Sequence, residues 1–190
     1  MQKNKKEKSN RRRPIKASKK IFSNLDRKTR QEKIEKAQNK ALSSSDLYYF
    51  LKGAENFLGV FASDELSNIR IISTPVFLIS NLDISDAPGS HWLSIRIDRS
   101  TIEIFDSLGF DQKLWGKFPL GLQKFLSRFR FSHNFYFSPI LQSPQTSDCG
   151  FYCVYFILFR TKLTFSECIS NFSSVLTLNH RILINKLKLM

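Results

Sequence analysis

The chain is poor in cysteine and has none before residue 149. Three cysteines among 190 residues are a small and odd number, which excludes a disulfide-stabilised scaffold and favours a reducing compartment. No run of about 18 apolar residues is present, so no transmembrane helix is expected. The charged N-terminus is not followed by an apolar segment, which excludes a secretory signal. We therefore expect a soluble, intracellular protein without a membrane partner.

Acidic residues are scarce at the start of the chain. Residues 1–40 contain 16 of the 30 Lys and Arg but only 4 of the 16 Asp and Glu, a net charge of +12, whereas residues 41–190 carry +2. Residues 1–45 also have almost no large apolar side chains, which predicts a basic, disordered leader, with a solvated helix over about 26–42. Residues 46–190 are then one domain with its own core.

The domain shows the pattern of an α+β fold. Ser45-Asp46 is a candidate N-cap for a first short helix, and residues 56–66 indicate a loop that leads to a second. Period-2 and β-branched runs predict strands over 75–79, 91–97, 101–105 and 134–137. Helical patterns cover 114–129, 149–160, 164–172 and 176–189. We expect a small, mostly antiparallel sheet between helical layers.

Cys149 is the candidate nucleophile. It precedes Gly150 and the apolar run Phe151–Phe159, which places it at the N-terminus of a helix. That helix is apolar on all sides. Backbone N–H groups and the helix dipole favour a thiolate at that position. A thiolate nucleophile needs a base, an acid that orients the base, and a donor for the oxyanion.

His91 and Asp106 are the candidate base and orienting acid. His91 starts one strand of a predicted hairpin and Asp106 follows the other, so antiparallel pairing brings them together. Asp106 would then accept the Nδ1–H of the histidine and fix its tautomer. The alternatives are a capping histidine and a turn-capping aspartate. The other histidines, His133 and His180, have no acidic neighbour of this kind in the sequence.

Gln142, seven residues before Cys149, is the candidate oxyanion donor, together with the Cys149 backbone N–H. Gln145 is a competing donor or a surface residue. Trp92 is a core aromatic residue or, next to the base, a wall of a narrow slot for the substrate backbone. Cys153 lies one turn after Cys149, which indicates a buried apolar role, because no His/Cys pair has the spacing of a zinc module. No metal is expected.

Taken in order, His91-Trp92, Phe105–Phe110 and Gln142-x6-Cys149-Gly150 resemble the adenovirus-type endopeptidase (adenain) family over roughly residues 46–160. That family shares a papain-like cysteine-protease clan with the proteases of SUMO and ubiquitin-like proteins, and similar enzymes are encoded by Polinton/Maverick and adintovirus-like elements. The resemblance implies the catalytic set His91, Asp106, Gln142 and Cys149. It also implies that Trp92 shapes a tunnel for a glycine-rich substrate backbone.

The resemblance also implies a function and its partners. We expect a cysteine-type endopeptidase that cleaves near small or glycine residues and matures virion or virus-like-element proteins. The alternatives are a SUMO or ubiquitin-like-protein isopeptidase, and an inert nucleic-acid-binding or capsid-associated protein. The chemistry requires no cofactor. The adenovirus enzyme commonly has Glu where this chain has Asp106, and its disulfide-linked activating peptide is not expected here, because no cysteine precedes Cys149.

The leader contains a basic cluster of the nuclear-localisation or nucleic-acid-binding type, formed by Arg11, Arg12, Arg13, Lys16, Lys19 and Lys20. Such an arm binds DNA without sequence preference and releases it as salt rises. The alternative is a solubilising or cleavable tail. Because adenovirus-type enzymes use DNA as a cofactor, the resemblance favours DNA as an activator. It also favours a location in the host nucleus, in the virion, or in both.

Overall fold

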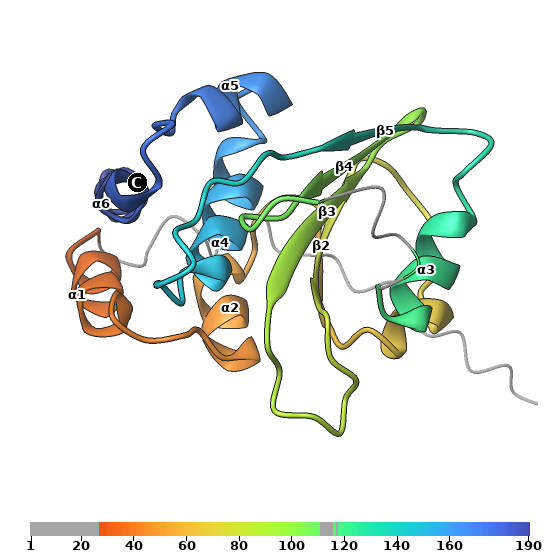
Figure 1. The fold of residues 1–190 in the computed structure, drawn as a ribbon, viewed down its shortest axis with the longest axis horizontal. Helices are drawn as coiled ribbons and strands as arrows, with labels where there is room; N and C mark the ends of the chain where they lie inside the picture. The colour runs from red at the N-terminus through yellow and green to blue at the C-terminus, as the bar shows by residue number, and fades with distance from the viewer. Residues whose placement is uncertain (1–26, 111–115, 117) are drawn as a thin grey trace, which may run out of the picture.

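The centre of the fold is a five-stranded mixed sheet (Figure 1). The computed structural model describes residues 27–110, 116 and 118–190. Its strands follow chain order across the sheet: β1 Phe57–Phe61, β2 Val76–Asn81, β3 Trp92–Ile97, β4 Thr101–Phe105 and β5 Asn134–Phe137. The central pairs β2/β3 and β3/β4 are antiparallel, whereas the edge pairs β1/β2 and β4/β5 are parallel. The prediction of a mostly antiparallel sheet therefore holds only for the centre.

Helices cover both faces of this sheet, as the sequence predicted for an α+β fold (Figure 1). One face packs against α3 and the 3-10 helix η2, and the other against α4 with the remaining helices around it. The bounds are α1 Arg27–Ala37, α2 Ser44–Leu51, η2 Glu65–Asn68, α3 Leu120–Ser127, α4 Cys149–Phe159, α5 Phe165–Ser170 and α6 Leu176–Lys188. Among the described residues, no helix has the length and apolar character to cross a membrane.

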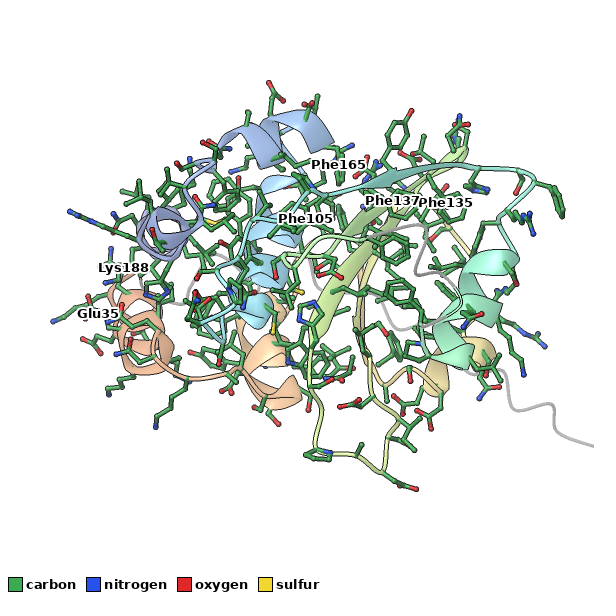
Figure 2. All side chains as sticks on the ribbon, viewed as in Figure 1. Glu35, Phe105, Phe135, Phe137, Phe165 and Lys188 are labelled. Atoms are coloured by element: carbon green, nitrogen blue, oxygen red, sulfur yellow. The ribbon has the colours of Figure 1, made fainter. Side chains whose placement is uncertain are left out.

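Helix α4 is buried between the sheet and the outer helices. Its residues from Cys149 to Ile157 are all buried, because the segment has no polar face to turn toward solvent. Phe156 stacks on Phe105 of β4 with ring centroids 4.5 Å apart, and Phe165 of α5 meets both rings edge-on (Figure 2). This packing fixes α4, the helix that begins at Cys149, against β4.

The folded part of the chain begins earlier than the sequence predicted. Helix α1 exists, but Ile34 is buried in the same core as α4, so the helix is not solvated on all sides. Helix α1 contacts the C-terminal end of α6. There, Gln31 Nε2 donates to the Lys188 carbonyl at 2.9 Å, and Lys188 pairs with Glu35 at 3.1 Å (Figure 2). Leu42 is buried as well. Residues 27–45, which the sequence assigned to a disordered leader, therefore belong to the folded structure.

Several element boundaries also differ from prediction. The N-cap of α2 is Ser43 rather than Ser45, and Asp46 completes its capping box from position N3. Residues 57–61 form strand β1, where a loop was predicted. The strand was missed because a register shift between Phe57 and Gly59 breaks its alternating pattern. Helix α3 is shorter than predicted, and the start of that prediction, residues 114 and 115, lies outside the described residues.

The C-terminus of α4 is joined to the sheet by buried charges. Arg160 donates from Nε and Nη2 to the two carboxylate oxygens of Glu103 on β4, at 2.8 and 2.7 Å. Arg96 of β3 approaches the same carboxylate at 3.3 Å and pairs with Asp98 at 2.5 Å. The C-terminal half of α4 is therefore held to the sheet both by the ring packing of Phe156 and by the ion pairs of Arg160.

Candidate active site

The β3–β4 hairpin brings His91 and Asp106 together. Ser94 pairs with Phe105, so the start of β3 lies next to the end of β4. His91 Nε2 and Asp106 Oδ1 are 2.7 Å apart, and both side chains are buried. This is the proximity predicted from the hairpin. A buried imidazole and carboxylate at this distance form a strong, charge-assisted hydrogen bond.

The ring nitrogen in this bond is Nε2, not Nδ1 as predicted. The prediction was wrong because chain pairing places residues side by side but does not set the orientation of a histidine ring. Asp106 Oδ1 also accepts from the Leu108 N–H at 2.9 Å. Since Nε2 is engaged by Asp106, Nδ1 is the ring nitrogen left to interact with Cys149, whose side chain contributes to the raised pKa of His91.

The surroundings of His91 favour its protonated form. Burial by itself lowers the pKa of His91, but hydrogen bonds to Asp106 and Cys149 and the charges of these two residues raise it, to about 9. Cys149 is the first residue of α4, where backbone N–H groups have no intrahelical acceptor and the dipole is positive. The site therefore favours a positively charged imidazole beside the Cys149 side chain.

The Gln142 side chain is buried and fixed at both ends. Its Oε1 accepts from Ser107 Oγ at 2.7 Å, and its Nε2 donates to the Thr146 carbonyl at 2.7 Å. Because a carbonyl oxygen only accepts, these partners determine which end of the amide is nitrogen. One of the two N–H groups of Nε2 is used on Thr146, which leaves the other for a ligand. Gln145 is exposed, so it is a weaker candidate for the oxyanion donor than Gln142.

Two serines that the sequence analysis did not select support this set. Ser107 orients Gln142, as described above, and Ser138 binds the backbone of Asp106 twice. Its Oγ accepts from the Asp106 N–H at 2.8 Å and donates to the Asp106 carbonyl at 2.7 Å. For Ser107 the adjacency to Asp106 was an available signal, whereas nothing in the local sequence connects Ser138 with a residue 32 positions earlier.

A cavity of about 560 Å³ opens beside Cys149. Trp92 lines it, and the indole Nε1 donates to the Leu42 carbonyl at 2.9 Å. The Leu42 side chain in turn lies against Gly150, where a Cβ would come within 2.8 Å of the Leu42 Cβ. Trp92 is thus both a core-packing residue and a wall of the cavity, so the two interpretations of it are not exclusive.

The remaining cysteines and histidines lie outside the group formed by Asp106, His91 and Cys149. Burial raises the pKa of Cys153 well above its ordinary value, as expected for an inert apolar residue. His133 contacts Ser132 and the Asp98 carbonyl. His180 does have an acidic partner, Asp148, which is 32 residues away in the sequence. Within the described ranges, no group of His, Cys, Asp and Glu has the arrangement of a metal site. The basic cluster Arg11–Lys20 lies outside the described residues.

Comparisons with known proteins give structural similarities. No protein-family model matches the chain, and no curated protein matches it. Among solved structures, the chain is similar to SUMO protease Ulp1 with its catalytic cysteine oxidised to a sulfinic acid, with 19% identity over 83% of each chain and a TM-score of 0.43. It is also similar to the ASFV pS273R protease, with 16% identity over 80% of this chain and 69% of that one and a TM-score of 0.49.

Proposed function

We propose that the protein is a cysteine peptidase with Cys149 as its nucleophile. The observation that carries this proposal is the buried His91, which is hydrogen-bonded to Asp106 at 2.7 Å and whose pKa is raised by Asp106 and by the neighbouring Cys149 side chain. A cysteine, a histidine and a carboxylate in this chain of contacts are the parts that thiol-dependent acyl transfer requires.

The geometry supports a two-step reaction. The Cys149 thiolate attacks the substrate carbonyl carbon, and the negative charge moves to the carbonyl oxygen. The free N–H of Gln142 Nε2 and the backbone N–H of Cys149 stabilise that oxyanion. Protonated His91 then gives its proton to the leaving amine, and the C–N bond breaks. Water, deprotonated by His91, hydrolyses the thioester and restores the thiolate.

We further propose an endopeptidase that cleaves near small residues, glycine in particular. The support is the position of Trp92 beside the base and along the cavity that reaches Cys149, with its indole fixed by the Leu42 carbonyl. A rigid aromatic wall next to the nucleophile favours substrates without a bulky side chain at the scissile bond. Maturation of virion or virus-like-element proteins, in the host nucleus or the virion, fits the resemblance of the His91, Asp106 and Cys149 segments to adenovirus-type proteases.

The test is a peptidase assay on a library of glycine-containing peptides, with and without duplex DNA. Wild type should cleave a subset of the peptides, and Cys149→Ala should cleave none. Cys153→Ala is a matched control, because it makes the same change one helical turn further along, at a buried thiol outside the reaction. Absence of turnover by the wild type under every condition would refute the proposal.

Two further measurements distinguish the alternatives. Folded SUMO and ubiquitin conjugates, assayed beside the peptides, separate an isopeptidase from an endopeptidase. Rapid labelling of Cys149 by iodoacetamide, lost in His91→Ala, separates an active site from an inert one. The reason is that a cysteine reacts quickly at neutral pH only when a neighbouring histidine stabilises its thiolate.

A further inference from the structure

The loop from Gln142 to Asp148 carries the proposed oxyanion donors at its two ends. Gln142 starts this loop, and Cys149 follows it as the first residue of α4. Donors of this kind act only when they are held within about half an ångström of their productive positions. Inside the loop, Gln142 Nε2 donates to the Thr146 carbonyl, which fixes the shape of the loop. The bonds of Gln142 to Ser107 join the start of the loop to the residues after β4, but they leave the Asp148 end of the loop without an attachment.

One end of the loop is attached to α6 through Asn179. This side chain is fully buried, and its Nδ2 donates to the Leu141 carbonyl at 2.8 Å, directly before Gln142. Nδ2 also donates to the Ser173 carbonyl at 2.9 Å, and Oδ1 accepts from the Ser173 N–H at 2.8 Å. Every polar atom of the Asn179 side chain is therefore engaged, which leaves it a single orientation. The Tyr152 hydroxyl shares the Leu141 carbonyl at 2.9 Å.

The other end of the loop is attached to the next residue of the same helix. His180 Nδ1 lies 2.9 Å from Oδ2 of Asp148, the residue directly before Cys149. Asp148 is the N-cap residue of α4, but its side chain makes no capping hydrogen bond to that helix. Its carboxylate is therefore directed to His180 instead of to its own helix, although capping is the common role for an aspartate at this position.

Helix α6 has a firm attachment of its own. Leu183, Ile184 and Leu187 are buried in the core that also contains α4. The far end of α6 is held by α1, through Gln31 and the Lys188 carbonyl. A helix fixed on both sides can transmit its position to the loop through two consecutive side chains.

We propose that Asn179 and His180 are positioning residues, which clamp the two ends of the Gln142–Asp148 loop onto α6 and so set the oxyanion donors in place. The catalytic part of this inference rests on the proposed peptidase function. Neither residue touches the reacting atoms. Formation of the thiolate depends on His91 and Asp106, which α6 does not contact through these bonds.

This division of roles predicts a selective defect. Hydrolysis of a peptide needs the oxyanion donors, whereas alkylation of Cys149 by iodoacetamide is a direct displacement that needs only the thiolate. Loss of the clamp should therefore slow hydrolysis and leave alkylation unchanged. A general loss of structure would slow both.

The experiment uses the full chain with His180→Ala, His180→Asn and His133→Ala. His180 is one-third exposed (33% of its side chain), so its replacement is tolerated better than that of the fully buried Asn179. In His180→Asn the amide nitrogen takes the place of Nδ1 and keeps the bond to Asp148. His133→Ala is the control, because its ring contacts Ser132 and the Asp98 carbonyl and none of the site.

For His180→Ala we expect kcat to fall by about 10- to 100-fold with little change in KM, since small displacements of catalytic groups have effects of this size. Its alkylation rate should stay within about twofold of wild type. His180→Asn should recover most of the lost turnover, and His133→Ala should match wild type. Unchanged turnover in His180→Ala, or turnover and alkylation that fall together, would overturn the proposal.

Amide hydrogen exchange separates this inference from the proposed function. Exchange at residues 142–149 should be faster in His180→Ala than in wild type or His133→Ala, whether or not the wild type hydrolyses a peptide. Equal exchange in all three proteins would refute the clamp. If exchange is faster in His180→Ala than in wild type, but the wild type hydrolyses no peptide, the clamp is retained and the peptidase function is rejected.

Discussion

The protonation of His91 sets the expected upper pH limit of the site. Burial opposes its charge, but the hydrogen bonds to Asp106 and Cys149 raise its pKa from 6.5 to about 9. His91 thus keeps its proton at neutral pH and loses it as pH rises through about 9. Because the leaving amine takes that proton, we expect kcat/KM to decline over the same range. The folded state should also lose stability as pH rises from 6.5 toward 9.

Asp106→Asn provides the test of this assignment. The substitution removes the charge that raises the pKa of His91, so the alkaline limb of the kcat/KM profile should move to lower pH. Profiles measured from about pH 6 to about pH 10 for both proteins make the comparison. An alkaline limit at the same pH in wild type and variant would show that another group controls it.

Gln142 provides a second prediction at the residue scale. Gln142→Ala should reduce kcat by roughly 10²–10³, the usual effect of losing one oxyanion donor. Gln145→Ala, the same change at an exposed position in the same loop, should retain wild-type turnover. Steady-state assays on one peptide substrate compare the two. Similar losses in both variants would argue against a specific role for the buried amide.

The sequence was sufficient to predict that His91 and Asp106 lie together, but not which residues hold the candidate site in place. His91, Asp106 and Cys149 occupy element ends, and strand pairing or helix polarity determines where element ends lie. Which ring nitrogen faces Asp106 depends on side-chain rotation, so that part of the prediction was wrong. Asn179 and His180 act through contacts between α6 and a loop more than 30 residues earlier, and no periodicity in the sequence encodes such a contact.

At the scale of elements, the ion pairs around Glu103 join α4 to the sheet. Glu103 is buried and faces two guanidinium groups, those of Arg96 and Arg160. Glu103→Gln leaves these cations without their shared counter-charge, which should reduce the free energy of unfolding by about 3–5 kcal/mol. Urea denaturation followed by circular dichroism measures this loss.

The control for this prediction is Glu35→Gln. Glu35 also pairs with a cation, Lys188, but its side chain is 57% exposed. Exposed pairs of this kind contribute little, so the change should stay within about 1 kcal/mol. A Glu103 variant as stable as the Glu35 variant would show that the buried ion pairs are not what secures α4.

The elements were predicted best where the local sequence has a regular hydrophobic pattern. Strands β4 and β5 have the predicted bounds, and α4 and α6 differ only at their ends. Strand β1 was missed because its register shift at Gly59 disrupts the period-2 pattern. The parallel edge pairs were missed for a different reason, since they join strands separated by intervening structure and no turn between them sets their direction.

At the scale of the whole molecule, the leader and the folded domain should separate cleanly by truncation. Removal of residues 1–26 should leave peptidase activity on short peptides intact and abolish binding to duplex DNA, because these residues hold 10 Lys and Arg but only 2 Asp and Glu. Removal of residues 1–43 should also destabilise the fold, since it takes away Ile34 and Leu42 from the core.

Thermal melting and fluorescence anisotropy with duplex DNA at several salt concentrations make these comparisons. The affinity of the full chain should fall steeply with salt, as expected for binding through phosphate contacts. Negligible affinity of the full chain at low salt would reject DNA as a partner. A truncation at residue 43 that melts like the full chain would reject a structural role for α1.

The attachment of the Gln142–Asp148 loop to α6 has a consequence for synthesis of the protein. The ribosome delivers His91, Asp106 and Cys149 before it delivers the two residues that hold the loop. A nascent chain that has emerged only as far as α5 can expose the nucleophile without its oxyanion donors in place. We therefore expect peptide hydrolysis to begin only after α6 has been translated and has packed on α4, so that partly synthesised chains do not cleave their surroundings.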